Sequence, residues 1–480
     1  MNTVFKNFIY NTGYQILAII VPIITTPYLS RIIGVEGIGK YSYANSIAYY
    51  FVMFIMLGLN NYGNRTIAGV RDDKNKLSRT FCEIYFLQLM IGIVVLIIYI
   101  IFCALFMPQN IIQWIMIVYV VSAIIDINWF FFGLEQFKLT ATRNIIIKLI
   151  TTICIFCFVK HKEDIVIYVL IVLLSMLISN AILWPFVFEF ISLTKVTIRS
   201  SFCHIKPNLI LFIPIVAISL YKCMDKIMLG IMCNMEQVGY YEYSEKIIQI
   251  PIALVNSLGT VMLPKMSNLV ANGDIREEKR YISISILVAM LCSSSLCFGL
   301  MAIAREFVPL FYGKGYEPCV HLFYILLPSC CFMAFANVIR TQYLIPNKKD
   351  EIYIKSVILG ALVNFFLNII LIRMMLSAGA AIATLAAELT VCLYQAFKTE
   401  KFLPIKKYFK NSILFVASGI IMFVSLINIS IDISELVIII GIKIILGVII
   451  YFGVLTIILL ICKNDFLKEI RIKWSRRYKN

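Results

Sequence analysis

Long apolar runs recur along the whole chain. Each runs for about 20 residues with few or no charges, which is the length an α-helix needs to cross the hydrocarbon of a bilayer. The predicted spans are 8–29, 41–62, 84–106, 111–134, 144–160, 165–188, 208–231, 240–263, 281–304, 320–345, 353–376, 378–397, 411–430 and 434–462. The spans 353–376 and 378–397 meet with almost no loop, so twelve spans is an alternative to fourteen. The pattern predicts an all-α polytopic membrane protein.

Composition supports the same class. Of the 480 residues, 61% are hydrophobic and 14% are charged, whereas soluble proteins are nearer half apolar and a quarter charged. Lys6 is the only charge before the first span, and no small-residue cleavage site follows that span, so we expect the first helix to stay in the mature protein.

The positions of the basic residues predict the orientation. With a cytoplasmic N-terminus, about 29 of the 43 Lys and Arg fall in cytoplasmic loops and tails, as the positive-inside rule expects. Both termini are then cytoplasmic. The net charge of +17 is explained by this orientation and by anionic lipid headgroups, so it does not indicate a nucleic-acid partner.

The segment Gly34–Ser42 nearly matches the phosphate-binding loop GxxxxGK[ST], but its context strongly disfavours nucleotide binding. Tyr41 stands where magnesium binding requires Ser or Thr, and a membrane span precedes the segment instead of a short strand. The segment belongs instead to an internal repeat. Gly39–Ile47 aligns with Gly239–Ile247 at an offset of 200 residues, sharing the Gly, both Tyr and the Ile.

The repeat predicts two six-helix lobes, residues 1–200 and 201–400, in the same orientation. Residues 401–480 then add two further helices and a basic cytoplasmic tail. Substrate sites in transporters built from repeats lie between the halves, near the membrane midplane. We therefore expect a central cavity.

Ionisable residues inside the spans are the strongest functional candidates, because each is costly in hydrocarbon. Lys222, Asp225 and Lys226 share one helix face, and Glu245 and Lys246 lie on the polar face of the next span. Further candidates are Arg31, Asp126, Lys148, Arg340, Lys355, Asn364, Asn368, Glu388 and Lys443. For Lys148, Lys355 and Lys443 we expect either side chains that reach the membrane interface or a span boundary that is misplaced, with no direct functional role.

Metal or redox chemistry is not expected. Most of the 14 Cys lie in apolar runs, including the pair Cys154 and Cys157, where Cys behaves as a small hydrophobe. The three His do not pair at ligand spacing. We expect no metal and no cofactor.

Several segments together resemble the bacterial polysaccharide flippases of the Wzx type. The segment 27–46 is similar to their N-terminal signature. Further similar segments are Gly133–Phe137 with Arg143 and Asn144, Asp225–Gly230, Val238–Ile247, Val261–Pro264, Phe311–Tyr316 and Ala380–Thr384. The resemblance extends over about residues 5–400 and is specific as a set.

This resemblance implies a member of the multidrug/oligosaccharidyl-lipid/polysaccharide exporter superfamily in the bacterial cytoplasmic membrane. Such flippases move an undecaprenyl-diphosphate-linked oligosaccharide to the outer leaflet by alternating access between two lobes, with an ion gradient as the expected driving force. The implied partners are this lipid-linked substrate, membrane lipid, and the polysaccharide polymerase with its chain-length machinery. We expect the protein to function as a monomer.

The site residues follow from the residues and the resemblance together. Excess cationic charge suits a diphosphate cargo. The expected substrate-binding residues are Arg31, Lys222, Lys226, Lys246 and Arg340. The expected ion-coupling residues are Asp225, Glu245 and Asp126, since a buried carboxyl can carry a coupling proton.

Two alternatives use the same scaffold: a flippase for the peptidoglycan lipid precursor, and a cation-coupled drug exporter. A membrane enzyme such as a polymerase or glycosyltransferase is disfavoured. The predicted loops are too short to hold a soluble domain, and Asp72 and Asp73 have no partner acid nearby to bind a metal.

Overall fold

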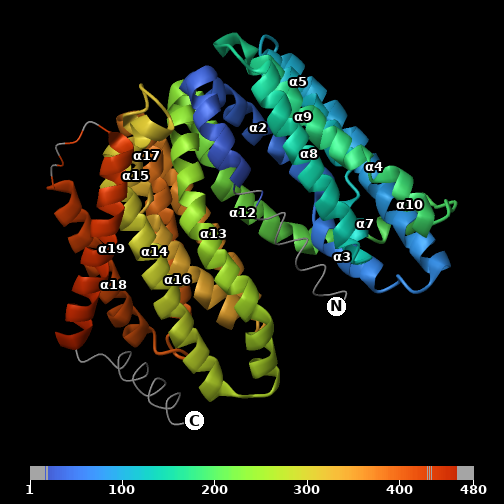
Figure 1. Cartoon of the computed structure of the whole chain (residues 1–480). Helices are drawn as coiled ribbons and strands as arrows, with labels where there is room; N and C mark the ends of the chain where they lie inside the picture. The colour runs from blue at the N-terminus through green and yellow to red at the C-terminus, as the bar shows by residue number, and fades with distance from the viewer. Residues whose placement is uncertain (1–16, 18–19, 430, 432, 434, 462–480) are drawn as a thin grey trace. The chain divides into compact units, whose positions relative to one another are not determined.

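The chain is built from α-helices in the part that the structure describes (Figure 1). The computed structural model describes residues 17, 20–429, 431, 433 and 435–461, with the side chains of residues 214, 217, 218, 220, 221 and 222 excepted. Contacts divide the chain into two compact units, Met1–Gly239 and Tyr240–Asn480. The lobe boundary at residue 200 stays a prediction, because it comes from the repeat and not from these contacts.

Unit 1 is organised around its first long helix. Its helices are α2 (Gly34–Met56), α3 (Leu59–Ala68), α4 (Lys74–Phe106), α5 (Ile111–Ile115), α6 (Ile117–Ile124), α7 (Asn128–Gly133), α8 (Phe137–Phe158), α9 (Ile165–Ala181), α10 (Trp184–Phe190), α11 (Ile198–Phe202) and α12 (Ile205–Met232). Residues 20–32, ahead of α2, are also helical. Helix α2 contacts α4, α6 and α12. Its approach to α12 depends on Gly230, where a Cβ would lie 2.1 Å from Cδ2 of Tyr43.

An aromatic core joins α3, α4 and α7 in unit 1. Trp129 and Phe130 are fully buried and pack on Phe81, with ring centroids 5.6 and 4.7 Å away. The indole of Trp129 also faces Gly63, where a Cβ would lie 2.6 Å from Cε3. Because Gly63 of α3 has no side chain, the indole of Trp129 can occupy this place in the core.

Unit 2 is organised around α14. Helix α13 (Met235–Ala271) begins in unit 1 and continues through unit 2, which further contains α14 (Ile275–Phe311), α15 (Pro318–Leu326), α16 (Ser329–Ile339), the π-helical turn η2 (Arg340–Leu344), α17 (Asp350–Thr399), α18 (Ile405–Ile427) and α19 (Leu436–Ile461). Helix α14 contacts α15, α16, α18 and α19. Figure 1 shows α14, α18 and α19 side by side.

Helix α17 is two helices joined by a sharp reversal at Leu376, whose φ of 53° and ψ of −132° are not helical. The halves pack tightly, because a Cβ on Gly379 would lie 2.1 Å from the carbonyl oxygen of Leu371 and one on Gly360 would lie 2.6 Å from Cγ2 of Val391. This confirms the expectation that the spans 353–376 and 378–397 meet almost without a loop.

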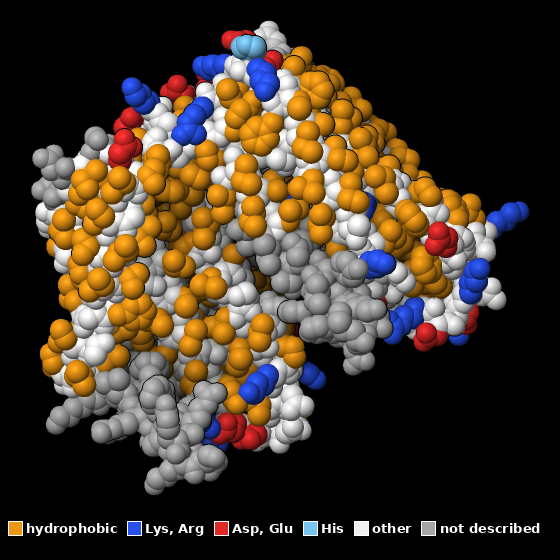
Figure 2. Space-filling view, in the orientation of Figure 1, with side chains coloured by type: hydrophobic (Ala, Val, Ile, Leu, Met, Phe, Trp, Pro, Cys, Tyr) orange, Lys and Arg blue, Asp and Glu red, His pale blue; other side chains and the backbone are white. Residues whose placement is uncertain are grey.

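The helices form a multi-pass membrane protein. Among the described residues, 11 helical segments are long and apolar enough to cross a membrane. Helix α12 covers the predicted span 208–231, and half of the predicted span 8–29 falls outside the described residues. On the face seen in Figure 2, hydrophobic side chains predominate and charged ones lie mainly toward the ends of the helices. Val437, Ile445 and Ile449 of α19 are each 63% exposed, as expected of side chains that face lipid.

The expectation that Lys443 reaches the membrane interface is wrong. Its side chain is 6% exposed, and Nζ lies 2.6 Å from Oε1 of Glu306 on α14. A charge this far from water requires an opposite partner. The pair attaches the additional helix α19 to the rest of unit 2. Lys355, by contrast, is exposed and pairs with Glu351 at 2.6 Å.

Candidate functional site

Charged residues lie in the C-terminal third of α12, a membrane helix of unit 1. Asp225 is 2% exposed and Lys226 is half-buried. Lys222 lies on the same helix, but its side chain is outside the described residues. A buried carboxylate next to a partly buried ammonium within an apolar helix is costly unless it serves a purpose. The predicted common face of these residues with Lys222, and their role in a cavity, stay predictions.

Helix α13 carries the second predicted charged face, within unit 2. Glu245 and Lys246 are both half-buried. Nζ of Lys246 lies 3.4 Å from Oε1 of Glu242 and 5.4 Å from the ring centroid of Tyr243. The lysine is thus held beside a carboxylate and an aromatic ring while about a third of its side chain stays accessible.

The two predicted arginines differ in their surroundings. Arg31 is exposed, and its Nη1 donates to the carbonyl oxygen of Pro27 at 2.8 Å. Arg340 is half-buried at the start of η2, with its guanidinium 5.3 Å from the ring centroid of Tyr353. Nη1 of Arg340 also lies 3.5 Å from the hydroxyl of Tyr353. A π-helical turn at this residue is notable because such turns are frequent at functional sites.

Asp126 lies in a break between α6 and α7, in unit 1. Ending α6 there frees backbone carbonyls that must find donors inside the membrane. Nε2 of Gln88 donates to the carbonyl oxygens of Ala123 and Asp126, each at 2.9 Å. The indole nitrogen of Trp184 donates to the carbonyl oxygen of Ile125 at 3.0 Å. Two side chains from other helices therefore make the break possible.

A network of polar side chains surrounds this break. We call Gln88, Asp126, Asn128, Arg143 and Asn180 the polar junction. Asp126 Oδ1 accepts from the backbone N–H of Asn128 at 2.9 Å and from its side-chain amide at 2.7 Å. Arg143 is 6% exposed and donates to Oδ1 of Asn128 at 2.9 Å and to the carbonyl oxygen of Ser179 at 2.9 Å. The side-chain amide of Asn180 donates to the backbone carbonyl oxygen of Ser122 at 3.0 Å.

Sequence reasoning named Asp126 but missed the rest of the junction as a site. Arg143 precedes the predicted span 144–160 by one residue, so it counted as a loop residue, whereas α8 begins at Phe137 and places it inside the helix. Asn128 and Asn180 each lie in predominantly apolar spans. A side-chain amide within such a span was the signal that could have identified these residues as candidates.

A second buried polar group lies between the two halves of α17. The amide of Gln395 donates to Oγ of Ser356 at 2.9 Å, and the amide of Asn368 donates to Oδ1 of Asn364 at 3.0 Å. Glu388 is 5% exposed on the second half. The spacing of four residues from Asn364 to Asn368 puts both on one face. The spacing of Asn364 and Asn368 was visible in the sequence, but the hydrogen bond between Gln395 and Ser356 was not.

Metal-binding geometry does not occur in the described part of the chain. No group of three or more His, Cys, Asp or Glu side chains there is arranged to hold a metal ion.

Comparison with known proteins identifies relatives along most of the chain. A family model described as "Polysaccharide biosynthesis protein" matches residues 4–270, more than half of the sequence. A protein of Escherichia coli (strain K12) named "Putative O-antigen transporter" is 26% identical over 396 residues, covering 80% of this chain and 94% of that protein. A protein of the same name from Shigella dysenteriae is 22% identical, covering 78% of this chain and 94% of its own length.

Solved structures show the fold. The lipid II flippase MurJ in an inward closed conformation superposes with a TM-score of 0.72 at 15% identity, covering 95% of this chain and 100% of that one. An inward-facing multidrug resistance transporter of the MATE family, from the MOP superfamily, has a TM-score of 0.57 at 11% identity, covering 81% and 99%. The chain therefore has the polytopic helical fold of these proteins, as the sequence predicted.

Proposed function

Because the chain belongs to the polysaccharide biosynthesis protein family, we propose that it is a flippase for a lipid-linked oligosaccharide. It moves the undecaprenyl-diphosphate-linked repeat unit of an O-antigen or capsule from the cytoplasmic to the outer leaflet of the cytoplasmic membrane. The relatives named as O-antigen transporters support this choice of cargo. It is a transporter and not an enzyme.

The observation that carries the proposal is the charge placed inside membrane helices α12 and α13. Asp225 and Lys226 on one helix, and Glu245 and Lys246 on the other, are costly inside a membrane, and such groups usually face a water-filled cavity or a partner. A diphosphate crossing a low-dielectric region requires cationic partners that it meets in turn. The proposed diphosphate contacts are Arg31, Lys222, Lys226, Lys246 and Arg340.

The acidic residues give the proposed coupling to an ion gradient. Asp225, Glu245 and Asp126 exchange a proton or cation while the protein alternates its access between the two sides of the membrane. Coupling of this kind lets the gradient drive the cargo outward. In this proposal the chain has two lobes, 1–200 and 201–400, an added segment 401–480, and both termini in the cytoplasm. It works as a monomer and transfers the cargo to the polysaccharide polymerase and its chain-length machinery.

The test is transbilayer movement of a fluorescent undecaprenyl-diphosphate oligosaccharide in liposomes that contain the purified protein. Movement is scored by loss of protection from an external quencher or hydrolase. We expect movement above that of empty liposomes, and acceleration by an imposed proton or sodium gradient. Replacing Asp225 or Glu245 by its amide should abolish the acceleration by the gradient.

Substitutions of the lysines test the cargo path. Lys226→Ala and Lys246→Ala should each slow movement about ten-fold or more, since each removes a charge-assisted contact with phosphate. Lys401→Ala, at an exposed position after α17, is the matched control and should leave the rate unchanged. Unchanged rates in both single variants and in the double variant would remove these lysines from the path.

The same assay separates the alternatives. Preferential movement of a peptidoglycan lipid precursor would assign the protein to that cargo instead. No movement of lipids with several different repeat units, together with proton-coupled uptake of a soluble organic cation, would assign it to drug export.

A further inference from the structure

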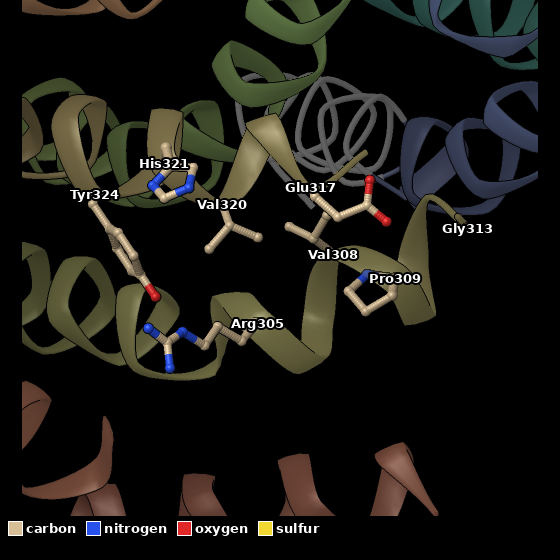
Figure 3. Close-up of a pocket in the computed structure, with 8 residues that line it drawn as sticks. All are labelled: Arg305, Val308, Pro309, Gly313, Glu317, Val320, His321 and Tyr324. Atoms are coloured by element: carbon tan, nitrogen blue, oxygen red, sulfur yellow. The ribbon is translucent and has the colours of Figure 1, made fainter. Parts of the chain in front are cut away.

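A pocket of about 310 Å³ opens in unit 2, where the end of α14 meets the beginning of α15 (Figure 3). Arg305, Val308 and Pro309 line it from α14, and Val320, His321 and Tyr324 from α15. The predicted span on α14 ends at residue 304 and the next begins at residue 320. The pocket therefore lies at the level where the chain leaves and re-enters the membrane, which is the depth of lipid headgroups.

Three polar groups on the pocket wall have no partner within the described residues. The hydroxyl oxygen of Tyr324 is buried and without a hydrogen bond there. The guanidinium of Arg305 and the imidazole of His321 likewise make no ion pair or hydrogen bond with any described residue. Figure 3 shows the Tyr324 hydroxyl and the Arg305 guanidinium pointing toward one another, with His321 beside the tyrosine ring. Arg305 and His321 are exposed, so water solvates both of them and a ligand at the mouth of the pocket can reach them. The buried Tyr324 hydroxyl is the costly group, because it has no partner among the described residues, and it is the observation that indicates a ligand.

The aromatic ring of Tyr324 is held in place by its neighbours, so the position of its hydroxyl in the pocket is defined. The Tyr324 ring packs edge-on against Phe423 of α18, with centroids 5.6 Å apart. Its centroid is 6.4 Å from that of His321. Packing on both sides fixes where the hydroxyl points. The side chain cannot turn away to find water without losing these contacts.

The opposite end of the pocket is acidic. Glu317 accepts a hydrogen bond from the backbone N–H of Gly315 at 3.2 Å, and in Figure 3 its carboxylate lies away from the arginine end. Val308 and Val320 form the wall between the two ends. The pocket thus offers donors and positive charge at one end, an apolar middle, and negative charge at the other.

We propose that this pocket binds the phosphodiester headgroup of an amine-bearing phospholipid. The guanidinium of Arg305 donates two hydrogen bonds to two oxygens of the phosphate. Tyr324 and His321 donate hydrogen bonds to the same phosphate, and the ammonium of the headgroup faces Glu317. Guanidinium is the side chain whose planar fork matches phosphate best. The acyl chains stay in the surrounding bilayer. The inference does not depend on the proposed function, because binding is measured without transport.

The first test is calorimetric titration of the full chain in detergent with dihexanoyl phosphatidylethanolamine below its micelle concentration. We expect saturable binding. Arg305→Gln should weaken it at least ten-fold and Tyr324→Phe about five-fold, as expected for a charge-assisted and a neutral hydrogen bond. Lys314→Gln, an exposed cation on the same connection but outside the pocket, should bind like the native chain. Equal affinities in all four proteins would overturn the proposal.

Two further titrations test the headgroup. Glu317→Gln should weaken binding of phosphatidylethanolamine while leaving binding of dihexanoyl phosphatidylglycerol unchanged, because only the former carries an ammonium. Inorganic phosphate should bind at least ten-fold more weakly than the lipid. Phosphate binding of equal strength, lost in Arg305→Gln, would assign the pocket to free phosphate and overturn the lipid assignment.

Discussion

Gly39 and Gly239 occupy equivalent positions of the internal repeat, and each packs against the other's segment. A Cβ on Gly39 would lie 1.7 Å from the carbonyl oxygen of Met235, and one on Gly239 would lie 2.1 Å from that of Val35. Val35 and Met235 are themselves 200 residues apart. The contact is therefore reciprocal, in the manner of an isologous interface.

Alanine at either glycine should open this contact. Backbone atoms, which cannot rotate away, occupy the place of the new methyl group, so Gly39→Ala and Gly239→Ala should each cost about 1–3 kcal/mol of stability. The measurement is thermal melting of the purified protein in detergent. Gly69→Ala is the control, because a Cβ there would first meet an atom at 3.5 Å. If Gly39→Ala and Gly239→Ala had the same melting temperature as this control, the contact would tolerate a methyl group.

Arg143 should be the most sensitive residue of the polar junction. Arg143→Met leaves the Asn128 amide oxygen and the Ser179 carbonyl without their donor, and it removes the cation from a buried site. We expect a loss of about 3 kcal/mol. Lys138→Met, an exposed cation on the same helix α8, should change stability by less than about 0.5 kcal/mol. Similar losses for the two variants, measured by denaturant unfolding, would contradict a structural role for the junction.

The junction also shows where sequence reasoning stops. Hydrophobic run length located the membrane helices, because the bilayer sets that length and each run satisfies it alone. The break at Asp126 was not predictable in this way. It depends on Gln88 and Trp184, which lie 38 residues before it and 58 residues after it. Likewise, the repeat revealed that Gly39 and Gly239 are equivalent, but only the structure showed that they touch.

Asp73 should make the start of α4 sensitive to acid. Its carboxylate accepts from the backbone N–H groups of Lys76 at 3.1 Å and Asn75 at 3.0 Å. The first of these hydrogen bonds is the main reason that the pKa of Asp73 lies below its usual value. A lowered pKa in the folded state means that the stabilisation is present above the unfolded value, about 3.9, and is lost as the pH falls through the folded value.

Hydrogen exchange of the peptide that contains residues 73–76 measures this effect. Protection, corrected for the intrinsic exchange rate, should decrease between pH 5 and pH 3 in the native chain. The Asp73→Asn variant can still cap the helix but does not titrate at this position, so its protection should stay constant over this range. The same pH dependence in the native chain and in this variant would show that another group controls this end of α4.

The buried pair of Lys443 and Glu306 should behave differently from an exposed pair. Lys443→Met leaves Glu306 as an unpaired carboxylate with 17% of its side chain exposed, which should cost about 3 kcal/mol. The double variant Lys443→Met with Glu306→Leu removes both charges and should recover most of that loss, because an apolar pair needs no compensation. Lys355→Met breaks the exposed pair with Glu351 and should cost less than about 1 kcal/mol. Denaturant unfolding of all four proteins completes the comparison. A double variant as unstable as Lys443→Met alone would mean that α19 depends on the shape of the lysine side chain, and not on its charge, for its attachment to α14.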